Sequence, residues 1–124
     1  MVPYMSEGAA MAVEDGAALA ETLSLIEFSL ELCPALKVFE RKRMIRTDQM
    51  QEASLVNGKL WHFADGPEQE ARDTAMQPEQ RIAGEKESPN QFSGPKTSKW
   101  AYGYDAEQEI RKAWVEHWAG SSRL

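Results

Sequence analysis

Two long stretches with helical periodicity fill the first half of this 124-residue chain, and they meet at Cys33-Pro34. In the first stretch, apolar residues recur at helical spacing from Ser6 to about Leu32. The second stretch runs to about Leu60 and opens on the proline, whose missing N–H is tolerated at the start of a helix. The short connection predicts that the two helices form a long antiparallel hairpin.

The second half of the chain predicts two shorter helices around a long loop. The turn signal Asp65-Gly66-Pro67 starts a third helix that ends near Met76. Residues 77–99 are rich in Pro, Gly, Ser and Lys and predict the loop. Asp105 and Gln108 form a capping pair for the last helix. With no credible strand, we expect an all-α single domain, 1–124, with helices within 1–32, 34–60, 67–76 and 105–120.

Charge and composition exclude several classes of function. The formal net charge of −6 argues against nucleic-acid binding, and no apolar run is long enough to span a membrane. The single cysteine, Cys33, cannot form an internal disulfide, which favours the cytoplasm, and we expect it to be a small buried hydrophobe. His62 and His117 lie far apart in the sequence, so we expect no metal site.

The charges divide between the two long helices, since the first is rich in glutamate and aspartate and the second in lysine and arginine. One interpretation is that the helices pair through complementary faces. Another is that Arg43 and Arg46 face an anionic ligand. The first helix also carries many small residues, and Gly16 in its interior indicates a close approach by another helix or by a flat ligand.

Two clusters carry residues suited to chemistry. In Trp61-His62-Phe63-Ala64-Asp65 an imidazole lies between aromatic residues and beside a carboxylate, which suits a general acid or base. The alternative is a helix-end histidine that hydrogen-bonds locally. In Trp100-Ala101-Tyr102-Gly103-Tyr104-Asp105 the aromatic residues either anchor a tail to the core or form the wall of a ligand site. The chain contains no GxGxxG, Walker A, HExxH, CxxC or serine nucleophile elbow motif.

The opening stretch MVPYMSEGAAMAVEDGAALAETL resembles the second flavin motif of fungal FAD-dependent aromatic hydroxylases, the salicylate-hydroxylase-like monooxygenases. The matching features are a Pro-containing turn, a helix that opens on Gly-Ala, and a Glu-Asp pair one to two turns later. The resemblance continues through FERKRMIRTDQMQEAS, WHFADGPEQEARD and WAYGYDAEQEI, so it covers most of the chain. It implies that the chain corresponds to the C-terminal helical portion of such an enzyme.

The resemblance implies that Pro3, Gly8 and Ala9 form a flavin-facing strip, with the first helix directing free N–H groups at the flavin pyrimidine carbonyl. The Gly-Asp pair that precedes this turn in the family is absent, and so are the Rossmann half and most of the substrate domain. We therefore expect no tight FAD binding by this chain alone, because nothing holds the adenosine and pyrophosphate.

Three functions stay open on the sequence. The first is a repurposed, cofactor-free protein of fungal secondary metabolism that binds an aromatic or polyketide-like small molecule, acts as a homodimer and catalyses a cyclisation, cycloaddition, isomerisation or dehydration. The second is an accessory module for a separate flavoprotein, and the third is a truncated monooxygenase. For the first function we expect His62 and Asp65 to act as acid or base, and Tyr102 and Tyr104 to donate hydrogen bonds. Arg43 and Arg46 would bind an anionic group of the ligand. The apolar walls of the site would come from four residues: Trp61, Phe63, Trp100 and Met50.

Overall fold

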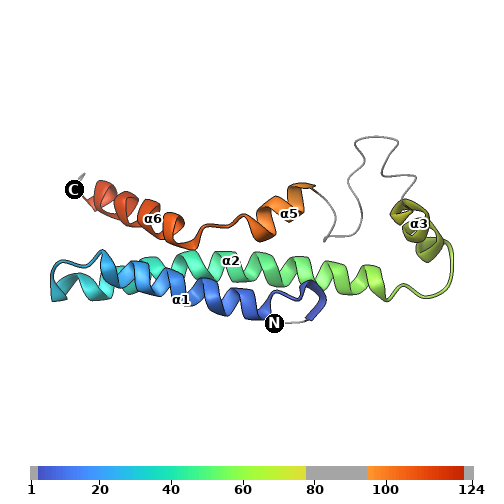
Figure 1. Cartoon of the computed structure of the whole chain (residues 1–124), viewed down its shortest axis with the longest axis horizontal. Coiled ribbons are helices and arrows are strands. Elements are labelled where there is room, and N and C mark those ends of the chain that lie inside the picture. Colours follow the sequence, from blue (N-terminus) through green and yellow to red (C-terminus); the bar gives the residue numbers. More distant parts are fainter. Residues whose placement is uncertain (1–2, 78–94, 122–124) are drawn as a thin grey trace. The chain divides into compact units, whose positions relative to one another are not determined.

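A computed structural model describes residues 3–77 and 95–121 of the chain. Every regular element in these ranges is helical, which confirms the predicted all-α fold (Figure 1). Two short 3-10 helices accompany five α-helices: η1 (Pro3–Met5), α1 (Gly8–Ser24), η2 (Ser29–Glu31), α2 (Leu32–Trp61), α3 (Pro67–Met76), α5 (Pro95–Tyr102) and α6 (Ala106–Ser121). Most of the expected 77–99 loop lies outside the described residues, but its last five residues belong to α5.

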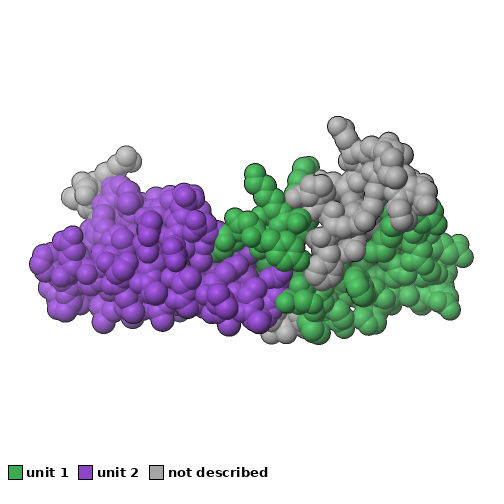
Figure 2. All heavy atoms as spheres, viewed as in Figure 1, with its two compact units in different colours: residues 1–6, 50–104 green, residues 7–49, 105–124 purple. Residues whose placement is uncertain are grey.

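The described residues group into two compact units (Figure 2). Unit 1 comprises residues 1–6 and 50–104, and unit 2 comprises residues 7–49 and 105–124. The long helix α2 contributes its first part to unit 2 and its second part to unit 1.

In unit 2, α1 runs antiparallel to the first part of α2, as the sequence predicts (Figure 1). Helix α1 also contacts α6. Ala18 of α1 is 0% exposed, and Ile110 and Ala113 of α6 are buried. The hydroxyl of Thr22 donates to the carbonyl of Ala18 across 2.7 Å. The start of α6 is capped as expected, since the backbone N–H of Gln108 donates to Asp105 Oδ1 at 2.8 Å.

The first helix is shorter than its apolar periodicity suggests, because α1 ends at Ser24. The Ser24 hydroxyl donates to the carbonyl of Glu21 at 2.8 Å. The carboxylate of Glu31 then accepts hydrogen bonds from the backbone N–H groups of Glu27, at 2.9 Å, and Phe28, at 3.2 Å. These side chains satisfy backbone groups that a continued helix would have used, and so they compete with helix formation.

Gly16 does not mark a close approach, contrary to the expectation from its helical position. A Cβ built at Gly16 meets no atom within 4 Å, and the residue is exposed. The contact between α1 and α6 therefore does not account for the glycine at this position.

In unit 1, the second part of α2 packs its buried residues Met50, Ser54 and Asn57 on one side. Gly66 adopts a φ of 151° before Pro67, which starts α3 at the residue that the sequence indicates. Arg72 of α3 then donates from Nη1 to the carbonyl of Leu60 across 2.5 Å, which ties α3 to the end of α2. Among the described helices, none combines the length and apolar character that crossing a bilayer requires.

Candidate functional site

The N-terminal turn Pro3–Ser6, which we call the η1 turn, belongs to unit 1. Its backbone closes on itself, because the N–H of Ser6 donates to the carbonyl of Pro3 at 3.0 Å. Ser6 adopts a φ of 57°, a left-handed conformation that is uncommon outside glycine. Met5 is buried to 1% exposure and anchors the turn, whereas Pro3 is exposed.

Asn57 of α2 holds the η1 turn through a hydrogen bond from its side chain to the backbone of the turn. Its amide Nδ2 donates to the backbone carbonyl of Tyr4 across 2.7 Å. Because a carbonyl can only accept, this bond also determines which way the amide is oriented. Asn57 is 0% exposed, and its Oδ1 has no hydrogen-bond partner among the described residues.

The Tyr4 side chain lies directly over α2. A Cβ on Gly58 would come within 2.6 Å of Tyr4 Cδ2, so only glycine fits beneath the ring. The imidazole of His62 meets the same ring edge to face, with centroids 5.3 Å apart and an interplanar angle of 74°. Tyr4 therefore fills the space between the turn and the end of α2.

His62 makes the local hydrogen bond of a helix-end histidine. Its Nδ1 lies 2.7 Å from the carbonyl of Gly58, and because the carbonyl only accepts, Nδ1 carries the proton. In the neutral ring Nε2 is then the basic nitrogen. The imidazole thus bonds Gly58 and not Asp65, although its Nε2 has the chemistry expected of a proton acceptor.

The first turn of α1 follows the η1 turn in the chain and opens without a side-chain cap. The first N–H groups of any helix lack intrahelical partners. Gly8, Ala9 and Ala10 are small and exposed, and open space surrounds the position where a Cβ of Gly8 would lie. The backbone of this helix start is thus accessible to a flat polar ligand.

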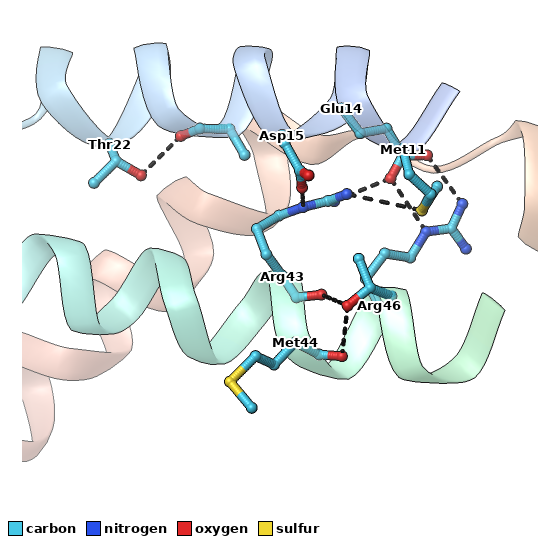
Figure 3. Close-up of polar contacts among 9 residues, drawn as sticks. Met11, Glu14, Asp15, Thr22, Arg43, Met44 and Arg46 are labelled. Atoms are coloured by element: carbon cyan, nitrogen blue, oxygen red, sulfur yellow. Dashed lines mark hydrogen bonds and ion pairs between the residues drawn. The ribbon is translucent and has the colours of Figure 1, made fainter. Parts of the chain in front are cut away.

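A cluster of charges in unit 2 joins α1 to α2 (Figure 3). Arg43 donates from Nε to Asp15 at 2.6 Å and from Nη1 to Glu14 at 3.0 Å. Arg46 donates from Nη2 to the other oxygen of Glu14 at 3.0 Å. Burial alone would lower the pKa of Arg43, but the hydrogen bonds with Asp15 and Glu14 outweigh it and raise this pKa.

The same cluster bears on both interpretations of the charged helices. Arg43 and Arg46 are 5% and 2% exposed, and the acidic residues of α1 occupy their guanidinium groups. Helices α1 and α2 pair through complementary charge, and the two arginines at the centre of this pairing are buried. An anionic ligand at either arginine would have to displace Glu14 or Asp15, so an anion-binding role stays a prediction.

The other candidates lie in unit 1. Met50 is completely buried, whereas Trp61 and Tyr102 are 56% and 58% exposed. Of the remaining candidates, Asp65 is exposed and the others are partly buried: Phe63, Trp100 and Tyr104. A hollow of about 320 Å³ opens beside Trp61 and is lined also by Arg72, Asp73 and Met76.

Cys33 is exposed and not buried, contrary to expectation. It lies in the first turn of α2, where it lines a hollow with Lys37, Arg41 and His117. In the part of the chain that the structure describes, no three His, Cys, Asp or Glu side chains gather closely enough to hold a metal ion.

The η1 turn and the uncapped start of α1 lie in the stretch that resembles a flavin motif, and the relatives of the chain as a whole are FAD-dependent monooxygenases. The chain is homologous to a segment of FAD-dependent monooxygenases and spans about a quarter of their length. It is 38% identical over 106 residues to FAD-dependent monooxygenase OpS4 of Beauveria bassiana, a match that covers 86% of this chain and 24% of that protein.

Two further relatives show how widely this segment occurs. FAD-dependent monooxygenase atnJ of Arthrinium sp is 45% identical over 74 residues, which cover 60% of this chain and 18% of that protein. The 3-amino-4-hydroxybenzoate 2-monooxygenase PtmB3 of Streptomyces platensis is 33% identical over 106 residues, covering 86% of this chain and 23% of that protein. No family model and no solved structure matches the chain.

Sequence reasoning did not single out Tyr4, Asn57 or Gly58. The sequence does hold one signal for them, since Asn57-Gly58 places two poor helix formers together inside a 30-residue helix. Such a pair indicates that something other than helix propensity determines these residues, and the structure identifies it as the contact with Tyr4.

Proposed function

We propose that this chain is a flavin-proximal helical segment of an FAD-dependent monooxygenase, and that it acts together with a dinucleotide-binding part of such an enzyme. That part would be carried by the same polypeptide or by a separate one. The proposal includes an aromatic substrate, because the name of one relative specifies 3-amino-4-hydroxybenzoate.

The observation that carries the proposal is the open start of α1. Gly8 begins a 17-residue helix with no side-chain cap, no acidic residue in its first turn and no atom near its Cβ position. The positive end of the helix dipole and the free N–H groups favour a ligand that carries negative charge. This helix start lies within the stretch that resembles the second flavin motif of FAD-dependent aromatic hydroxylases.

The described residues fit one end of FAD and not the other. The backbone at Gly8 and Ala9 is accessible, as the pyrimidine edge of a flavin requires. No strand or glycine-rich loop occurs among the described residues to hold the pyrophosphate and adenosine. Retention of FAD by this chain alone is therefore not expected, in keeping with the proposed need for a dinucleotide-binding part.

Within that assembly, the residues of this chain bind and orient. A bound flavin supplies the redox chemistry with which a monooxygenase uses dioxygen. The first-turn N–H groups of α1 would hold the electron-rich edge of the ring. His62, with Nε2 as its basic nitrogen, is the candidate proton acceptor of unit 1.

A second candidate function is cofactor-free binding of an aromatic or polyketide-like small molecule. The hollow beside Trp61 favours it, since a volume of about 320 Å³ suits a small aromatic compound. In this function Trp61 would supply the wall and Arg72 a positive charge. A second copy of the chain would then cover exposed apolar side chains such as Phe28 and Leu30, which are 65% and 89% exposed.

A reconstitution experiment separates the two functions. The purified chain is mixed with FAD alone, and separately with FAD and the part of the Beauveria bassiana monooxygenase that lies outside its match to this chain. Size-exclusion chromatography with absorbance at flavin wavelengths reports association and bound flavin together. We expect flavin to co-elute with the chain only in the mixture that contains the dinucleotide-binding part.

Two controls make the outcome decisive. A chain with Gly8→Glu, which places an acidic side chain at the flavin-facing helix start, should associate with the partner but retain less flavin. Failure of the unaltered chain both to associate with the separate part and to retain flavin when fused to it would overturn the first function. Saturable quenching of tryptophan fluorescence by aromatic acids, lost in Trp61→Leu, would then support the second.

A further inference from the structure

We infer that the hollow at the start of α2 is a binding site for a small, soluble phosphate monoester, whose phosphate group is held by Lys37 and Arg41 of α2 together with His117 of α6. The hollow has a volume of about 360 Å³ and is lined by Cys33, Pro34, Lys37, Val38, Arg41 and His117. The inference needs neither a flavin nor a second protein part, so it stands apart from the proposed function.

The lining of the hollow follows from the helical period of α2. Cys33, Lys37 and Arg41 are four residues apart, so they lie along one face of the helix on successive turns. His117 comes from a different helix, α6. The hollow is therefore formed by two helices, and all of its described lining residues belong to unit 2.

The two cations of the hollow differ from their basic neighbours on α2. The neighbours form ion pairs with acidic residues of α1 or α6: Lys42, Arg43 and Arg46. In contrast, the side chains of Lys37 and Arg41 make no hydrogen bond or ion pair with the described residues, and both are exposed. The chain has 20 acidic and 14 basic residues, yet none of the described residues that line this hollow is acidic.

His117 adds a hydrogen-bonding group whose ring is held in place. The ring stacks on Trp114 with centroids 5.9 Å apart and an interplanar angle of 13°. It also meets Trp118 edge to face, with centroids 5.4 Å apart and an angle of 77°. An imidazole fixed between two indoles can donate a ring N–H to an oxyanion without first losing much side-chain freedom.

Charge and size together favour a phosphate monoester. Such a group carries nearly two negative charges near neutral pH and three acceptor oxygens, which match two cations and an imidazole. A single carboxylate would compensate only one of the two cations. A volume of about 360 Å³ lies in the usual range of small-molecule sites, and Pro34 and Val38 offer apolar surface to the organic part of the ester.

The first experiment follows binding by NMR of the imidazole signals in the full chain. The chain has two histidines, so His62 of unit 1 serves as the internal reference for His117. At constant pH we expect phenyl phosphate to shift the His117 signals saturably, and benzoate to bind roughly tenfold more weakly. Lys37→Gln and Arg41→Gln should each weaken the binding of phenyl phosphate roughly tenfold.

Two further variants control this experiment. Lys59→Gln removes an exposed lysine from the last turn of the same helix and should leave binding unchanged. Lys37→Arg keeps the charge and should keep most of the affinity, which separates a loss of charge from a loss of folding. The absence of a saturable shift at His117 would overturn the site, and benzoate that binds as tightly as phenyl phosphate would overturn the choice of phosphate.

The second experiment uses Cys33, the single cysteine of the chain, to measure the charge of the hollow. Iodoacetate and iodoacetamide both alkylate a thiolate, forming a C–S bond and releasing iodide, but only iodoacetate is an anion. The ratio of their rates therefore cancels the ionisation of the thiol and retains the effect of nearby charge. We expect this ratio to be roughly threefold higher in the folded chain than in urea.

The same ratio should fall toward its value in urea when the positive charge is removed or compensated. Lys37→Gln combined with Arg41→Gln removes the charge, and phenyl phosphate compensates it. A ratio that does not change on folding, or that ignores both changes, would overturn the positive hollow.

Vesicles that contain phosphatidic acid distinguish a soluble ester from a lipid headgroup, because both present a phosphate monoester. The net charge of −6 opposes binding to an anionic membrane surface, so we expect the chain to stay in the supernatant when the vesicles are sedimented. Co-sedimentation that Lys37→Gln abolishes would show that the phosphate belongs to a lipid and would overturn the assignment to a soluble ester.

Discussion

Arg43 of α2 donates from Nε to Oδ1 of Asp15 on α1 across 2.6 Å, and this pair lies at the centre of the charge cluster of unit 2. Its guanidinium is 5% exposed, so it depends on the acidic residues of α1 for the interactions that water would otherwise provide. Removing one partner of a buried ion pair usually costs more than the pair itself contributes, because the other charge is left uncompensated.

The first prediction follows from that asymmetry. Arg43→Ala should lower the free energy of unfolding by about 2–3 kcal/mol, below the usual range for fully buried pairs because Asp15 is 46% exposed. Urea denaturation followed by circular dichroism measures the loss. Arg41→Ala removes an exposed arginine of the same helix and should change stability by less than about 0.5 kcal/mol. Equal effects of the two substitutions would contradict the structural role of the cluster.

The second prediction compares two glycines that both lie inside long helices. Gly16→Ala should stabilise the chain by about 0.5–1 kcal/mol, because alanine favours the helix and its Cβ meets nothing within 4 Å. Gly58→Ala should destabilise it, because the same methyl group would lie 2.6 Å from the Tyr4 ring. Thermal unfolding of the two variants gives the comparison, and a gain of stability in both would show that Tyr4 does not pack on α2 as described.

The sequence predicted those parts of the fold that local signals control. Pro67 and the turn before it indicated the start of α3, and Asp105 indicated the start of α6, because each acts within a few residues. The end of α1 was not predictable in this way. The apolar pattern continues past Ser24, but the carboxylate of Glu31 takes backbone N–H groups that the pattern cannot reveal.

The candidate site shows the same division. The family resemblance implies a flavin-facing role for Pro3, Gly8 and Ala9, which stays a prediction, and residue type alone makes His62 a candidate acid or base. Asn57 could not be assigned a role in advance, because its hydrogen bond to Tyr4 spans 53 positions and depends on the folded chain. The exposure of Cys33 was likewise unpredictable, since it depends on which way the first turn of α2 faces.

The third prediction concerns acid. The hydrogen bond from Arg111 lowers the pKa of Glu21 below its usual 4.5, and the hydrogen bond from Lys112 does the same for Glu109. A carboxyl group whose pKa is lowered by folding stabilises the folded state above its unfolded pKa. The free energy of unfolding should therefore be constant near neutral pH and fall once the pH drops below about 4.5 and through the lowered values.

Two variants test the origin of this acid sensitivity. Glu21→Gln should lower the free energy of unfolding at pH 7, and its difference from the unaltered chain should narrow as the pH falls, because the carboxylate is then lost in both. Glu52→Gln, at an exposed position of α2, should leave the pH profile unchanged. A difference for Glu21→Gln that does not vary with pH would contradict the assignment to Glu21.

The last prediction concerns Ser6, whose φ of 57° is tolerated by glycine and opposed by a β-branched side chain. Ser6→Val should destabilise the chain relative to Ser6→Gly by about 1–2 kcal/mol, because the left-handed conformation brings Cβ close to the following carbonyl. The effect on the unfolded chain has the opposite sign. Valine restricts the unfolded chain more than glycine does, which by itself would make Ser6→Val the more stable variant. A lower stability of Ser6→Val therefore cannot arise from the unfolded state. Urea denaturation of both variants provides the measurement, and a Ser6→Val chain as stable as Ser6→Gly would show that the turn does not require the left-handed conformation.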